Sequence, residues 1–404
     1  MQGLYGPFTI AERVVQKIWL RRDFEQSDLR LVDGRSILIR APGSWNLLGG
    51  PDFRDARLMI DGVPLAGDVE VHFHSSDWHA HRHAEDRAYD KVVLHVILFP
   101  PGPDERRALR RDGREIPALV LLPWLYRGLE EYAADEALEK ITSQDAAEKI
   151  SDLAALAAAD RDVLLRAHAT RRWEMKVHFA ALRIDKLGWT DAAHHAALEI
   201  LGYKRNRAPM VATATAHPLR EWVTGLEPAA LVDERKGEWQ RQGSRPANHP
   251  LRRLQQYQAW VRARPGWPEI LKGIAADKQE LKTLPANTPS ARKQGKMPQL
   301  REGWTMELTA GVMGSARFDT LVCDGLLPLV AAETRTDLSA LWFHWYLGDV
   351  PDGLRKALAM LGLAGHPHLP FCHGWAQGFL GWLTEREARA SRWSTENLPE
   401  LDKH

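Results

Sequence analysis

The sequence predicts an α+β protein, with an N-terminal mixed sheet followed by mainly helical domains. Residues 69–74 alternate strictly between apolar and polar side chains, which is the pattern of a half-buried strand. Asp-Gly dipeptides at 33–34, 61–62 and 112–113 are typical of tight hairpin turns. Residues 124–208 contain no proline and are rich in Ala, Leu, Glu, Lys and Arg, which are strong helix formers. Strands are therefore expected first and helices afterwards.

The N-terminal elements are expected in a definite order. Residues 8–20 carry apolar residues at helical spacing after Thr9, a plausible N-cap. Strands follow, and a short connection over 75–91 that resembles a loop leads to a buried strand over 92–98. A further apolar strand is expected over 116–122.

Composition changes along the chain predict four segments. These are an α/β domain over 1–123, a helical domain over 124–281, a linker or long loop over 282–303 and a C-terminal helical domain over 304–404. The linker is predicted because Pro285, Pro289, Pro298 and Gly295 lie among polar residues.

The overall composition is that of an ordinary globular protein. The chain has 404 residues, of which 44% are apolar and 26% are charged, with a formal net charge of +1. Its two cysteines, Cys323 and Cys372, cannot form a disulfide framework. No signal-peptide pattern and no long apolar run is evident, so we expect a cytoplasmic protein without a membrane span.

A candidate metal site is split between two predicted strands. Asp52 lies at the start of one strand, and alternation places Glu70, His72 and His74 on one face of the next. Carboxylates are the ligands that Mg²⁺ or Mn²⁺ prefers, so we expect Asp52 and Glu70 to hold the ion. His72 would act as a base or orient a phosphate, with Asn46, His74 and Asp77 as supporting residues. The alternative is that these side chains only form a solvated strand face.

The same residues resemble the core of the PD-(D/E)XK nucleases. In that superfamily a helix, an Asp strand, a Glu strand and a buried strand follow one another in this order. His72 stands where the superfamily has a lysine, and the connection over 75–91 is shorter than usual. The resemblance implies hydrolysis of phosphodiester bonds in nucleic acid.

A dense group of histidines supports a competing zinc chemistry. Six of the seventeen histidines lie between residues 72 and 95. His72, His74, Asp77 and His79 approach the HxHxDH motif of the metallo-β-lactamase fold, although the spacing is wrong at two places. Surface positions are expected for His79, His81 and His83, and His95 is expected in the core. A zinc hydrolase therefore remains the less favoured alternative.

Short motifs along the chain resemble the bacterial family called domain of unknown function 2851. The resemblance implies membership of that family and no particular chemistry. It rests on the following residues: Asn46, Gly50-Pro51-Asp52-Phe53, Gly67, Val69-Glu70, His72, Ser75-Ser76-Asp77-Trp78, His81, Leu94-His95-Val96, Leu201-Gly202-Tyr203-Lys204, Asn206, Arg245-Pro246-Ala247-Asn248-His249-Pro250, Arg253, Leu326-Leu327-Pro328 and Gln377-Gly378.

A basic stretch with interleaved aromatic residues offers a possible nucleic-acid surface. Residues 239–268 contain six arginines and no Asp or Glu. Arg245, Arg252 and Arg253 are candidates for phosphate contacts, with nearby aromatic rings for base stacking. The alternative is a helix that packs through Trp239, Tyr257, Trp260 and Trp267 and exposes its arginines.

The sequence thus favours a metal-dependent nuclease. The alternative from another class is a non-catalytic protein that binds nucleic acid or serves as a scaffold, which the missing lysine would favour.

Overall fold

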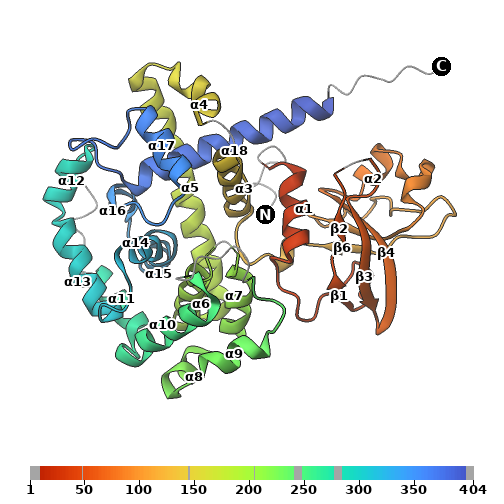
Figure 1. The fold of residues 1–404 in the computed structure, drawn as a ribbon, viewed down its shortest axis with the longest axis horizontal. Coiled ribbons are helices and arrows are strands. Elements are labelled where there is room, and N and C mark those ends of the chain that lie inside the picture. Colours follow the sequence, from red (N-terminus) through yellow and green to blue (C-terminus); the bar gives the residue numbers. More distant parts are fainter. Residues whose placement is uncertain are drawn as a thin grey trace. The chain divides into compact units, whose positions relative to one another are not determined.

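A computed structural model describes residues 10–47, 49–143, 146–203, 205–240, 248–276 and 284–396. The chain divides into two compact units, Met1–Ala133 with Glu387–His404, and Ala134–Arg386. A mixed sheet in the first unit precedes a mostly helical region, so the predicted fold class is confirmed (Figure 1). Among the described residues, no helix is long and apolar enough to cross a membrane.

The first unit is built on one mixed sheet with the strand order β1-β3-β4-β5-β6. β1, β3 and β4 are antiparallel, while β4, β5 and β6 are parallel, and β2 pairs with β3. The strands are β1 (Ile37–Ala41), β2 (Ser44–Trp45), β3 (Phe53–Ile60), β4 (Val63–His72), β5 (Val92–Ile97) and β6 (Ala118–Val120).

Local sequence explains the hairpin and the first helix. Asp61 and Gly62 join β3 to β4 with φ values of 47° and 80°, the pair of positive angles that a type I′ turn needs. Helix α1 (Glu12–Arg21) contacts β4 and buries Val14, Val15, Ile18 and Trp19. Thr9, the predicted cap, lies outside the described residues.

The connection from β4 to β5 consists of single helical turns. These are α2 (Asp77–Ala80), η1 (His83–Glu85) and η2 (Arg87–Tyr89). Gly67 lets β4 approach β5 closely, because a Cβ there would overlap Val93 and the Lys91 carbonyl.

The rest of the chain is helical, and its core is rich in tryptophan. Trp222, Trp260, Trp267, Trp342 and Trp345 are almost fully buried. The elements are η3 (Leu122–Trp124), α3 (Leu129–Ser143), α4 (Ala146–Ala154), α5 (Ala158–Leu187), α6 (Trp189–Leu201), α7 (Arg207–Ala216), α8 (Leu219–Thr224), α9 (Pro228–Glu234), α10 (Pro250–Ala263), α11 (Trp267–Ala276), α12 (Thr288–Gln294), α13 (Met297–Thr309), α14 (Ser315–Thr320), the π-helical turn η6 (Leu321–Leu326), α15 (Leu327–Thr334), α16 (Ser339–His344), α17 (Asp352–Met360) and α18 (His373–Glu396).

The prediction of a linker or long loop over 282–303 is wrong, because α12 and the start of α13 lie there. Pro289 and Pro298 occupy the first turns of these helices, where a missing N–H removes no intrahelical bond. The Asn287 side chain caps α12 by accepting from the Ser290 N–H. The prolines therefore mark helix starts rather than a linker. The other predicted domain boundaries stay predictions.

Candidate metal site

Strand pairing brings Glu70, His72 and His95 together. Glu70 and His72 lie on the same face of β4, as alternation predicts, and β5 runs parallel beside it with His95 level with Glu70. His72 Nδ1 lies 2.9 Å from His95 Nε2. Both rings are buried, with His95 fully excluded from solvent, so the expected core position of His95 is confirmed.

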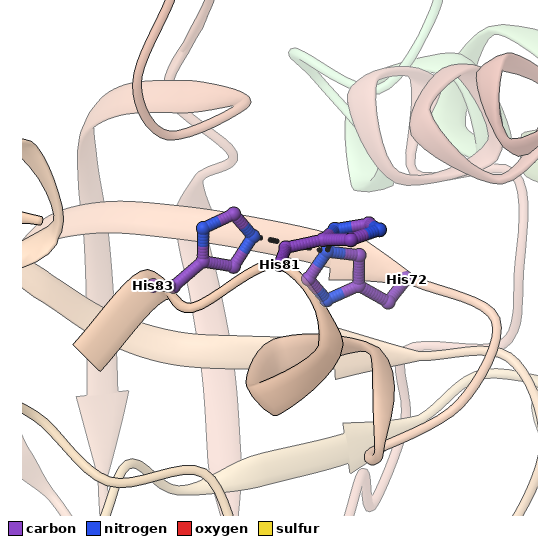
Figure 2. Close-up of side chains that lie close together, drawn as sticks. All are labelled: His72, His81 and His83. Carbon is purple, nitrogen blue, oxygen red and sulfur yellow. Dashed lines mark hydrogen bonds between the residues drawn. The ribbon is translucent and has the colours of Figure 1, made fainter. Parts of the chain in front are cut away.

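The connection after β4 returns two more histidines to His72. His72 Nε2 lies 3.2 Å from His81 Nδ1 and 3.3 Å from His83 Nε2 (Figure 2). Glu70 Oε1 lies 3.4 Å from His72 Nε2 and 3.3 Å from His83 Nε2. His72 and His83 are buried while His81 is exposed, so the group meets solvent on the His81 side.

These separations match the ligand spacing of a tetrahedral metal site. Metal–ligand bonds of about 2.0–2.1 Å place neighbouring tetrahedral ligands about 3.3 Å apart. Four contacts among Glu70, His72, His81 and His83 lie between 3.2 and 3.4 Å. The three imidazole nitrogens all lie within 4.8 Å of one another. The group could therefore hold one cation.

The carboxylates of Asp52 and Glu70 lie beside this group and clamp the two strands. The Asp52 N–H donates to Glu70 Oε2 at 3.0 Å, and the Val71 N–H donates to Asp52 Oδ2 at 3.1 Å. Gln16 of α1 donates from Nε2 to Asp52 Oδ1 at 2.8 Å. The structure thus brings Asp52, Glu70 and His72 together.

Burial shifts the acid strength of these carboxylates in one direction. Burial raises the pKa of Glu70 to about 8. Burial and the Glu70 charge raise the pKa of Asp52 to about 7. Burial and the neighbouring acids, Asp52 first, raise the pKa of Glu12 on α1 to about 8. All three acids are therefore harder to ionise than free carboxylic acids. A bound cation would favour their charged form.

The histidines are shifted toward their neutral form. Burial lowers the pKa of His72 well below its ordinary value, and burial also lowers the pKa of His83 to about 4 and that of His95 to about 3. Burial likewise lowers the pKa of His81. Neutral imidazole is the form that binds metal ions, so the rings are held ready as ligands.

Comparison of the sequence with models of known protein families identifies the family of this chain. A family model described as "Protein of unknown function (DUF2851)" matches residues 12–225, which is more than half of the chain. The chain belongs to the DUF2851 family. No curated protein and no solved structure matches it. The candidate metal site of this DUF2851 protein lies inside the matched residues.

The predicted supporting residues have different positions. Asn46 donates from its side chain to the Pro51 carbonyl at 2.9 Å and so supports the turn that leads to Asp52. Asp77 accepts from the His74 N–H at 2.9 Å at the start of α2. The His74 ring stacks on Phe99, with centroids 5.1 Å apart, whereas the His81 and His83 rings approach His72.

The aromatic residues among the arginines are core residues rather than a stacking platform. All four are buried, in agreement with the alternative of a helix that packs through them: Trp239, Tyr257, Trp260 and Trp267. Arg252 is exposed, whereas Arg253 is buried. Arg245 lies outside the described residues.

Sequence reasoning missed the grouping of His81 and His83 with His72 and treated both as surface residues. His83 is buried, so the surface expectation is wrong for it, while His81 is exposed as expected. The residue between them, Arg82, has a φ of 56°, which turns the chain sharply. The signal was the alternation His81-x-His83 soon after His72. Nothing in the sequence indicated that Glu12 and Gln16 would lie near Asp52.

Proposed function

We propose that the first unit of this DUF2851 protein is a metal-dependent hydrolase. Its cation is a divalent transition metal, with Zn²⁺ as the first choice, held by His72, His81 and His83, and Glu70 would accept a proton from a water in the open fourth position. The observation that carries the proposal is the approach of three groups, His81 Nδ1, His83 Nε2 and Glu70 Oε1, to within 3.2–3.4 Å of His72 Nε2. Nitrogen donors favour Zn²⁺ over Mg²⁺.

The neighbouring residues suit such a site. When His72 ligates through Nε2, its Nδ1–H can donate to His95 Nε2, and this hydrogen bond would orient the His72 ring. His72 then acts as a ligand rather than as the base expected from the sequence. The Asp52 carboxylate accepts from the Val71 N–H, and the Asp52 N–H donates to the Glu70 carboxylate. Asp52 therefore holds both residues of β4 in place.

The substrate class comes from the sequence. A metal held here would polarise a phosphoryl oxygen and activate a water for attack on a phosphodiester. The element order of helix, Asp52 strand, Glu70 strand and buried strand supports the PD-(D/E)XK resemblance, which stays a prediction. The exposed His81 side of the group gives a substrate access. Hydrolysis at Mg²⁺ or Mn²⁺ bound by Asp52 and Glu70 also stays a prediction.

Elemental analysis of protein purified without added metal tests the site. We expect one zinc per chain, lost in His81→Ala and His83→Ala. His79→Ala is the matched control, because His79 lies on the same connection but directs Nε2 to the Arg107 carbonyl, 3.0 Å away. Equal zinc in His81→Ala and the control would contradict the proposal.

Activity is tested separately on single- and double-stranded oligonucleotides. Glu70→Gln should lower cleavage roughly 10²-fold, the loss typical of one electrostatic catalytic group. Zinc binding without cleavage of any phosphodiester would reject the hydrolase and favour the non-catalytic alternative.

A further inference from the structure

A second polar site lies in the helical unit, where two acid-free segments of the chain meet. Residues 200–220 and 239–268 contain ten arginines and lysines and no Asp or Glu. The segments meet at Tyr203, just after α6, whose ring is in contact with two arginines. The Arg253 Cζ lies 4.8 Å and the Arg317 Cζ 3.0 Å from the ring centroid.

Arg253 of α10 is buried among neutral groups. It donates from Nη2 to the Tyr203 hydroxyl at 2.6 Å and to Asn248 Oδ1 at 2.8 Å, and from Nη1 to Gln256 Oε1 at 2.5 Å. Its Nε is buried without a hydrogen-bond partner. Within the described part of the chain, no carboxylate pairs with this guanidinium. A buried charge with neutral partners alone is costly.

Arg317 of α14 also lies against the ring and is equally buried. It donates from Nη1 to the Ile200 carbonyl at 3.1 Å, and its Nη2 lies 2.9 Å from Asp349 Oδ2. The same carboxylate oxygen accepts from the Tyr203 hydroxyl at 3.2 Å. Burial, together with the charges of Arg253 and Arg207, lowers the pKa of Arg317 to about 10.

The charges of this group do not balance. Of the two guanidinium groups only that of Arg317 pairs with a carboxylate among the described residues, and this carboxylate, Asp349, has 41% of its side chain exposed. Arg207 adds a third cation nearby, although it pairs with Asp135 at 3.5 Å. Tyr203 itself has a φ of 53°, a conformation that costs free energy for a non-glycine residue. The chain thus holds an excess of positive charge around Tyr203.

We propose that Arg253, Arg317 and Tyr203 form a binding site for a phosphate group. Guanidinium groups bind phosphate oxygens through charge-assisted hydrogen bonds, and phosphate would supply the missing negative charge. Helices α7 and α10 begin at Arg207 and Pro250, within four residues of Tyr203 and Arg253, and helix N-termini favour anions. The half-buried Tyr203 and the exposed Asp349 carboxylate leave the site open to solvent on one side.

Titration calorimetry of the full chain tests the site with two probes, inorganic phosphate and a twelve-nucleotide single-stranded DNA. Arg253→Gln should weaken binding of the preferred probe roughly tenfold, as expected for losing a charged hydrogen-bond donor. Asp349→Asn should strengthen it about twofold to fivefold, because it removes a competing surface carboxylate. A purely structural role for the group predicts no gain from Asp349→Asn.

Arg262→Gln on the same helix is the matched control, since Arg262 is exposed and makes no contact with Tyr203. Thermal unfolding without ligand identifies variants that fail to fold, and Asp349→Asn is then decisive because its side chain is partly exposed. Tighter binding of the oligonucleotide identifies nucleic acid as the source of the phosphate, and equal or tighter binding of inorganic phosphate identifies a small ligand. Binding of neither probe, or equal weakening by Arg253→Gln and Arg262→Gln, would overturn the proposal.

Discussion

Two buried histidines, His194 in the helical unit and His72 in the sheet unit, differ in what their nitrogens face. Both are almost completely buried, and burial lowers the pKa of both. His194 Nδ1 lies 2.6 Å from the Tyr257 hydroxyl, and Nε2 lies 3.0 Å from the His217 carbonyl. Each nitrogen therefore has a partner of suitable polarity, and the ring is a satisfied core residue.

His72 Nε2 faces two other imidazole nitrogens and a carboxylate oxygen. A neutral imidazole carries a single N–H, so one proton on each ring cannot satisfy every pair in such a group. His72 Nε2 has only one lone pair in its neutral ring, and a bound cation would satisfy all these atoms at once. The partners of a buried histidine, rather than its burial, therefore distinguish a core residue from a metal ligand.

Zinc-dependent stability provides the largest expected contrast between the two regions. At a zinc concentration about a thousandfold above Kd, binding to the folded protein should add about 4 kcal/mol to the free energy of unfolding. Urea denaturation with and without zinc measures this gain. His72→Ala should abolish it, and His194→Asn should retain it. A His72→Ala protein that still responds to zinc would place the metal elsewhere.

Removing the Tyr257 hydroxyl should lower the free energy of unfolding more than removing the His81 ring does in the absence of metal. Tyr257→Phe leaves His194 Nδ1 without its buried partner and should cost about 1–3 kcal/mol. His81→Ala, measured without metal, removes an exposed side chain and should change stability by no more than about 0.5 kcal/mol. Equal losses in urea denaturation would show that His81 stabilises the fold directly.

The pH dependence of stability tests the buried carboxylates of the sheet unit. Above about pH 6.5 unfolded histidines are mainly neutral, so the carboxylates dominate. Glu12 and Glu70, with pKa values of about 8, and Asp52, at about 7, hold protons in the folded state that the unfolded state has released. Stability of the metal-free protein should therefore fall as pH rises from about 6.5 to 8.

Glu12→Gln tests this slope without touching a proposed ligand, and the exposed Glu85→Gln is its control. Unfolding midpoints between pH 6.5 and 8 should decline less in Glu12→Gln than in the control. An identical decline in both variants would mean that Glu12 is ionised in the folded protein.

Local pattern predicted much of the sheet unit. Alternation over 69–74 placed Glu70 and His72 on one face of β4, the apolar run over 92–98 became β5, and Asp61-Gly62 formed the expected turn. These signals work because strand periodicity and turn angles depend on neighbouring residues. In the helical unit, prolines were misinterpreted because their meaning depends on whether a helix begins beside them.

The full candidate site could not be predicted because it depends on distant contacts. His81 and His83 reach His72 through the positive φ of Arg82, which no local preference of arginine indicates. Glu12 and Gln16 reach Asp52 from a helix more than thirty residues earlier in the sequence. Tertiary packing decides both.

The reciprocal bonds of Asp52 and Glu70 have a consequence for separation-of-function variants. Because the Asp52 carboxylate accepts from the Val71 N–H, and Glu70 accepts from the Asp52 N–H, these acids belong to the strand framework as well as to the site. A substitution of Asp52 therefore confounds loss of chemistry with loss of folding. His81, exposed and bonded through its ring alone to the group, is the position at which an inactive but folded protein can be made to trap a substrate.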